Sequence, residues 1–157
     1  MHPQPATPVT PELCAHEVME TVPLVMHFIR TEMRSRRAPL LSVPQFRVLT
    51  YLNRVPGAPL ASVAEHLGVT RSTASAIVDR LVRRKLVNRT EDPQERRCVV
   101  LTLTAAGAQH LQQAREAACA DIAKVLAGLS AADLLRVTAG LALLGGAFKE
   151  IVAPRRR

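Results

Sequence analysis

Hydrophobic positions between Leu60 and Leu103 change their spacing in a defined order. Apolar residues first recur at the spacing of a short helix, and Gly68 marks a turn after it. A longer helix follows, in which one apolar stripe recurs at helical spacing. Two short strand-like runs then enclose a charged tip. The segment therefore predicts a helix, a turn, a second helix and a two-stranded hairpin.

Proline and threonine residues predict two consecutive helices near the N-terminus. Thr10 and Pro11 have the residue types of a helix start, a cap followed by proline in the first turn. Pro23 is expected to kink or restart that helix, with Thr21 as a new cap. The restarted helix should cover about residues 22–37.

Three further helices are predicted from their caps. Ser42, Thr104 and Ser130 can each accept a hydrogen bond from an unpaired backbone N–H at a helix start. The expected ranges are 42–53, 104–128 and 130–149. The last two are rich in Ala and Leu on more than one face, a pattern that suits burial against another subunit.

The longer helix of the central pattern has a small and polar exposed face. Thr70 is a good N-cap, and the apolar stripe runs through Ala74, Ile77, Val78 and Leu81. The opposite face carries Ser72, Ala76, Asp79 and Arg83, flanked by Ser75 and Arg80. Small polar side chains let a helix backbone approach the base edges of a DNA major groove.

Positive charge is concentrated on the same helix. Asp79 is the one acid between Thr70 and Thr90, a stretch whose basic residues are Arg71, Arg80, Arg83, Arg84, Lys85 and Arg89. The formal net charge of the whole chain is +8 and its pI is about 10.7, which favours an anionic partner. Aromatic residues are only 3% and Trp is absent, so single-strand binding by base stacking is disfavoured. A run of charge can also be a solvated helix face, but its place before a hairpin favours contact with duplex phosphates.

These motifs resemble the MarR family of winged helix-turn-helix transcriptional regulators. The matching segments are 41–49, 67–73, 77–87 and the wing from Asp92 to Arg97, followed by Leu-Thr at 103–104 and Gly107. The resemblance implies a mainly α fold, a winged helix-turn-helix with a two-stranded β-wing and a helical dimerisation region. It also implies a homodimeric repressor that binds a pseudo-palindromic operator in double-stranded DNA. Gln94 and Lys85 depart from the pattern, since many members have arginine and glycine there.

The resemblance divides the chain into functional segments. The expected segments are a disordered tail (1–9), N-terminal dimerisation helices (10–41), the DNA-binding lobe (42–103), C-terminal dimerisation helices (104–150) and a basic tail (151–157).

Candidate DNA contacts lie on the second helix and on the wing. Arg96 is expected to enter a minor groove, where arginine is favoured by enhanced negative potential. Arg97 is expected to bond Asp92 and shape the wing, and is kept as a DNA candidate too. The full set of candidates is Arg71, Ser72, Thr73, Ser75, Ala76, Arg80, Arg83, Arg84, Arg96 and Arg97.

A small effector, such as a phenolic or aromatic acid, is implied by the family. His27 and Arg30 could present a proton donor and a cation to its carboxylate, although a surface ion pair of Arg30 is the simpler interpretation. A thiol-based redox sensor is the alternative, with Cys14 as the candidate thiol. Cys98 and Cys119 are expected to fill the core. A winged helix that binds only protein is a further alternative.

Other functional classes find little support in the sequence. Enzyme motifs are absent, the five histidines are scattered without metal-ligand spacing, and no cofactor is expected. No secretory signal is visible, and no apolar run is expected to reach membrane-spanning length. The widely spaced cysteines fit a reducing cytoplasm.

Overall fold

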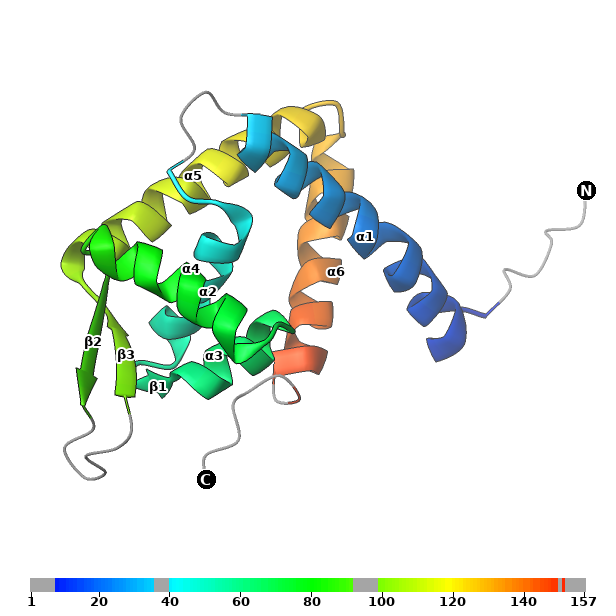
Figure 1. The fold of residues 1–157 in the computed structure, drawn as a ribbon. Helices are drawn as coiled ribbons and strands as arrows, with labels where there is room; N and C mark the ends of the chain where they lie inside the picture. Colours follow the sequence, from blue (N-terminus) through cyan, green and yellow to red (C-terminus); the bar gives the residue numbers. More distant parts are fainter. Residues whose placement is uncertain (1–7, 36–39, 92–98, 150, 152–157) are drawn as a thin grey trace, which may run out of the picture.

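The computed structural model describes residues 8–35, 40–91, 99–149 and 151. Within these residues the chain is mainly α-helical, as predicted, with a small antiparallel sheet (Figure 1). Its elements are α1 (Pro11–Ser35), α2 (Val43–Arg54), β1 (Ala58–Pro59), α3 (Leu60–Leu67), α4 (Arg71–Arg83), β2 (Val87–Glu91), β3 (Val99–Leu103), α5 (Ala105–Leu126) and α6 (Ala131–Lys149). The helix-turn-helix consists of α3 and α4, and the hairpin of β2 and β3 follows it.

The hydrophobic core lies in the lobe formed by α2, α3, α4 and the sheet. Its fully buried side chains come from all of these elements: Leu41, Val48, Leu49, Leu52, Val63, Val78, Leu81, Leu86, Val87 and Leu101. Leu111 and Ala114 of α5 close the same cluster. By contrast, α6 buries none of its residues in the single chain, and it runs alongside the lobe in Figure 1. The lobe is thus packed within one chain, whereas α6 is not.

The predicted two strands of the wing are confirmed as β2 and β3, and a short strand, β1, joins the same sheet at its other edge. The order is β1-β3-β2, and β1 pairs with β3 through Ala58 opposite Leu101 and Pro59 opposite Val100. The segment around Pro56 and Pro59 has the composition of a turn. A proline cannot donate to a neighbouring strand, which confines this segment to a very short edge strand.

The first helix is continuous through Pro23, so the predicted restart at Thr21 is wrong. Thr10 does cap the helix, as predicted, because its hydroxyl accepts from the Leu13 N–H at 3.3 Å. Pro23 removes the hydrogen bond to the Met19 carbonyl. Met19 is 71% exposed, so water can hydrate that carbonyl and the helix can continue.

The other predicted caps are confirmed. Ser42 and Gln45 form a reciprocal capping box at the start of α2. The hydroxyls of Thr70 and Thr104 accept from backbone N–H groups in the first turns of α4 and α5. Ser130 likewise accepts from the Asp133 N–H at 3.2 Å before α6.

The end of α4 is closed by Lys85 in a left-handed conformation, with φ of +58°. The Lys85 N–H donates to the Val82 carbonyl, and the Leu86 N–H donates to the Leu81 carbonyl. These two bonds form the helix-ending motif that usually has glycine at the left-handed position. Lys85 therefore carries backbone strain, because a side chain disfavours this conformation by about 1–2 kcal/mol.

A tight junction joins this turn to the start of α5. The Thr104 N–H donates to the Leu86 carbonyl at 3.1 Å, and the Thr104 hydroxyl donates to the Lys85 carbonyl at 2.7 Å. Gly107 lies in the first turn of α5, and a Cβ at this position would overlap the Leu86 carbonyl oxygen. The glycine of the Leu-Thr-x-x-Gly motif is therefore required by a close backbone approach.

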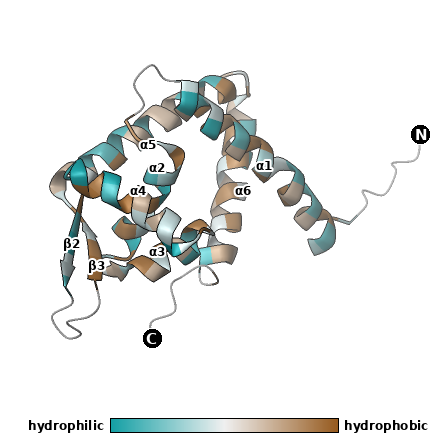
Figure 2. Ribbon diagram, viewed as in Figure 1, coloured by the Kyte–Doolittle hydropathy of each residue, from teal (hydrophilic) through white to brown (hydrophobic). Residues whose placement is uncertain are grey.

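One helix contradicts the expectation that no apolar run reaches membrane-spanning length. Among the described residues, α6 is 19 residues long with a mean hydropathy of 1.4, enough by length and composition to cross a membrane. It begins with an ion pair between Arg136 and Asp133. Both α6 and α1 carry hydrophobic segments (Figure 2), and apolar side chains of the two helices line one pocket.

Gly107→Ala should lower the free energy of unfolding by about 3 kcal/mol, because the new methyl group meets a backbone carbonyl that cannot move independently. Chemical denaturation followed by circular dichroism measures this change. Gly128→Ala is the matched control, because a Cβ there would contact nothing within 4 Å. Equal stabilities of the two variants would show that the junction tolerates expansion.

Candidate nucleic-acid interface

Helix α4 is held in place by its apolar stripe. Ala74, Val78 and Leu81 have 0% exposure and pack into the lobe against α2, α3 and β2. Ile77 is only partly buried at the edge of that stripe. Since one face is occupied by the core, the other face of α4 points outward across the lobe (Figure 1).

The start of α4 carries several hydroxyl groups that form hydrogen bonds with one another. Gly68 adopts φ of +70°, which turns the chain sharply from α3 toward α4. The Thr70 hydroxyl lies 3.0 Å from the Ser72 hydroxyl and 2.9 Å from the Thr73 hydroxyl, and it accepts from the Thr73 N–H. Ser72 and Thr73 are exposed. The N-terminus of α4 therefore presents hydroxyls together with the positive end of the helix dipole.

The single acid of α4 is paired with the hairpin. Asp79 accepts from Arg89 of β2 at 3.0 Å and from the Ser75 hydroxyl at 3.4 Å. Both members of the ion pair are more than a third exposed, so the pair contributes little to stability. It does neutralise the one negative charge on the outer face and link β2 to α4.

The basic residues of α4 differ in their surroundings. Arg71, Arg80 and Arg83 are exposed, and the Arg83 Nε donates within its own helix to the Asp79 carbonyl at 3.4 Å. Arg84 instead reaches out of its helix. It donates to the Leu40 carbonyl at 2.8 Å and to the Gln45 Oε1 at 3.2 Å. Among the α4 candidates, Ser75 is partly buried and Arg84 is bonded to another part of the lobe. The others are exposed: Arg71, Ser72, Thr73, Ala76, Arg80 and Arg83.

The sequence did not reveal two side chains, Arg47 and His66, that join α2 to α3 in the helix-turn-helix. Arg47 of α2 donates to the carbonyls of His66 and Leu67, the last residues of α3, at 2.9 and 3.3 Å. The imidazole of His66 stacks on Tyr51, with ring centroids 4.5 Å apart. Burial lowers the pKa of His66, and the positive charges of Arg47 and Arg54 lower it further. A partner roughly 20 residues away leaves no local sequence signal.

Of the other predicted residues, four lie outside the described part of the chain and two lie on another helix. Arg96, Arg97 and Asp92 lie outside the described residues, as does Cys98. His27 and Arg30 are exposed on α1 and line neither of the two pockets described next.

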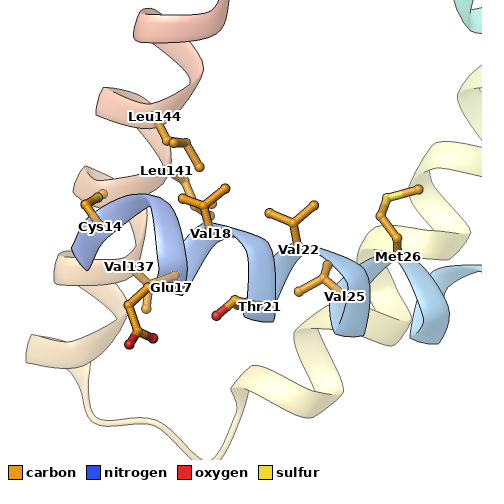
Figure 3. Close-up of a pocket in the computed structure, with 11 residues that line it drawn as sticks. Cys14, Glu17, Val18, Thr21, Val22, Val25, Met26, Val137, Leu141 and Leu144 are labelled. Carbon is orange, nitrogen blue, oxygen red and sulfur yellow. The ribbon is translucent and has the colours of Figure 1, made fainter. Parts of the chain in front are cut away.

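Two apolar pockets lie along α1. The larger, of about 460 Å³, lies between α1 and α6 and is lined mainly by aliphatic side chains, among them Val18, Val22 and Leu141 (Figure 3). The smaller, of about 270 Å³, lies between α1 and α5 and includes Phe28 and Ile122. Neither contains a basic side chain, so neither has a cation for an acidic ligand.

Both cysteines in the described residues are exposed, which contradicts the expectation for Cys119. Cys14 is exposed on α1 and lines the larger pocket. Cys119 is exposed on α5, so its predicted role in the core of the chain is wrong. The alanine-rich face that suggested burial belongs to a helix with only three buried residues. Within the described part of the chain, no three His, Cys, Asp or Glu residues are grouped so as to hold a metal ion.

Comparison with known proteins agrees with this geometry. Residues 41–97 match the model of the MarR family. The HTH-type transcriptional regulator YfiV of Bacillus subtilis, itself uncharacterised, is 28% identical over 109 residues, covering 69% of this chain and 68% of the relative. The predicted resemblance to MarR-family regulators is confirmed.

Solved structures share the fold. The transcriptional regulator Tm0710 of Thermotoga maritima superposes with a TM-score of 0.69 at 21% identity, over 89% of this chain and 99% of that one. FabT of Streptococcus pneumoniae, solved in complex with DNA, superposes with a TM-score of 0.58 at 20% identity, over 89% and 98%. At these identities the two structures establish the winged helix-turn-helix architecture.

The pKa of His66 predicts a pH dependence of stability. A lowered pKa in the folded state means that the unfolded chain binds more protons once the pH falls below about 6.5. The His66 contribution is therefore complete above that pH and declines as the pH falls below it. The stability difference between the native protein and His66→Gln should shrink between pH 7.5 and pH 5.5 in urea denaturation. A difference independent of pH would contradict this assignment.

Proposed function

Since the chain carries the winged helix-turn-helix of the MarR family, we propose that it binds duplex DNA at specific sites and regulates transcription. The observation that carries the proposal is the outer face of α4. Its residues are small or polar near the N-terminus and basic toward the C-terminus, and its one acid is paired. Such a face fits a major groove, where hydroxyls reach base edges and arginines reach phosphates.

The proposed contacts divide by chemistry. Ser72, Thr73, Ser75 and Ala76 face the bases. Arg71, Arg80 and Arg83 contact the phosphates, which position the helix but carry little sequence information. The wing contact through Arg96, and the shaping of the wing by Arg97 and Asp92, remain proposals from the sequence.

We propose that the protein acts as a homodimer through α1 and α6. Large apolar side chains on these helices are exposed in the single chain, including Leu24 (71%), Leu135 (72%) and Leu143 (77%). Monomeric proteins rarely expose large contiguous apolar patches. A second copy can cover the same surface on both chains through a two-fold axis. Two α4 helices would then read half-sites about one DNA turn, or ~34 Å, apart.

A repressor in the cytoplasm, released by a small acidic or phenolic effector, is the form of regulation that we propose. His27 and Arg30 are three residues apart on α1, so they share one exposed face of the helix. Together they offer a hydrogen-bond donor and a cation to a carboxylate. The exposed Cys14 on the same helix keeps a redox-sensing repressor as the second candidate.

The native protein should select a two-fold symmetric site from a pool of randomised duplexes. Ala76→Leu should weaken binding to the selected duplex at least about tenfold, because a larger side chain holds α4 away from the base edges. The melting temperature should stay nearly unchanged, because Ala76 is exposed and leucine favours helices.

Ala76→Ser, which stays small, is the matched control and should retain binding. Fluorescence anisotropy with the selected duplex measures all three proteins. Failure of the native protein to enrich any duplex would favour the alternative of a winged helix that binds only protein.

Leu141→Glu should convert the dimer into a monomer at micromolar concentration. Leu141 is 62% exposed in the single chain and lies where α6 faces α1 (Figure 3). A charge buried between two copies without a partner would cost several kcal/mol. Light scattering coupled to gel filtration gives the mass. Val69→Glu, in the turn before α4, should leave the dimer intact; a native monomer would refute the proposed assembly.

A further inference from the structure

Arg84 differs from the other arginines of α4 in where its side chain goes. It is the residue that ends the helix, and its guanidinium spans two acceptors on another part of the lobe. One is the Leu40 carbonyl at 2.8 Å, and the other is the Gln45 Oε1 at 3.2 Å. These partners precede Arg84 by 44 and 39 residues. The contact is therefore a tertiary link between the last turn of α4 and the start of α2.

Both acceptors belong to segments that are also fixed by other contacts. The Gln45 Oε1 already accepts from the Ser42 N–H at 3.0 Å in the capping box of α2. Leu40 is followed by Leu41, whose side chain is only 2% exposed in the core. A planar guanidinium with its donors in a fixed fork can bridge two such oxygens, whereas an ammonium group is a single point donor. Arg84 therefore links the end of α4 to the start of α2 through two hydrogen bonds.

We propose that Arg84 is a positioning residue, which sets the orientation of α4 for base recognition instead of contacting a phosphate. The inference rests on the proposed DNA-binding function. Rotation of α4 about its axis would break the contact with Leu40 or with Gln45. Leu40 also lies between α1 and α2, so Arg84 ties the reading helix to the point where the proposed dimer helix enters the lobe. The adjacent Arg83 lacks this geometry, since it donates within its own helix.

The two roles of an arginine predict different binding profiles. Loss of a phosphate contact weakens binding to all sequences equally and reduces the slope of log K against log salt by about 0.9. Loss of a positioning contact weakens binding to the specific site and leaves non-specific binding and the salt slope unchanged. Charge also separates the roles, because lysine can replace a phosphate contact but cannot reproduce the fork.

The experiment compares Arg84→Gln and Arg84→Lys with the native protein on two duplexes. One is the duplex selected from the randomised pool, and the other is a scrambled duplex of equal length and composition. Both variants should bind the selected duplex about tenfold more weakly. Their affinity for the scrambled duplex should change less than about twofold, and their salt slope should equal that of the native protein. Arg83→Gln is the matched control, and its slope should fall by about 0.9.

A double-mutant cycle tests the link to Gln45. Gln45→Leu should reproduce the loss of specificity, and adding Arg84→Gln to it should change the affinity little further. Gln45→Glu keeps both the capping box and an acceptor, so it should retain native affinity. Thermal melts monitor folding in every variant.

The outcomes separate the two hypotheses. If Arg84→Gln lowers affinity for both duplexes equally and reduces the salt slope, or if Arg84→Lys restores native binding, the positioning role is wrong while the DNA-binding function stands. Additive effects in the double-mutant cycle would also overturn the role. Equal affinity of the native protein for the two duplexes would overturn the proposed function and this inference together.

Discussion

The junction between the end of α4 and the start of α5 is the constraint on which the other parts of the structure depend. The backbone of Lys85 and Leu86 is bonded to Thr104, and Gly107 lets α5 approach the Leu86 carbonyl closely. The end of α4 and the start of α5 are therefore in contact through backbone atoms. Side-chain repacking can relax little at such a contact. The orientation of α5 relative to α4 therefore follows from covalent geometry and two hydrogen bonds.

The outer face of α4 shows how charge is organised around that junction. Its paired acid joins the helix to β2, and its terminal arginine joins it to α2. The other arginines remain exposed for an anionic partner. A mostly basic helix thus uses some of its charges for attachment to the lobe and leaves the remainder at the surface. Because exposed ion pairs contribute little free energy, these attachments act through geometry more than through stability.

The distribution of apolar surface is the physical basis of the proposed dimer. The lobe buries its leucines and valines internally, whereas α1 and α6 keep theirs exposed. A pocket of about 460 Å³ between these two helices extends that exposed surface. Covering apolar surface is favourable by about 25 cal/mol per Å², which supports the proposed association. Association through α1 and α6 would fix the separation of the two α4 helices.

The sequence by itself determined those features that depend on neighbours within a few residues. The caps at Ser42, Thr70 and Thr104, the apolar stripe of α4 and its basic outer face were all predicted, because each arises from helical spacing or from a side chain bonding three residues away. Features that depend on distant partners were decided only by the tertiary structure. The helix α1 continues through Pro23, where the preceding turn is exposed at Met19, and the strand at Ala58 exists because β3 lies beside it. Arg84 has the same local sequence context as Arg83, yet its acceptors lie 39 and 44 residues away, and no local pattern encodes contacts at that separation.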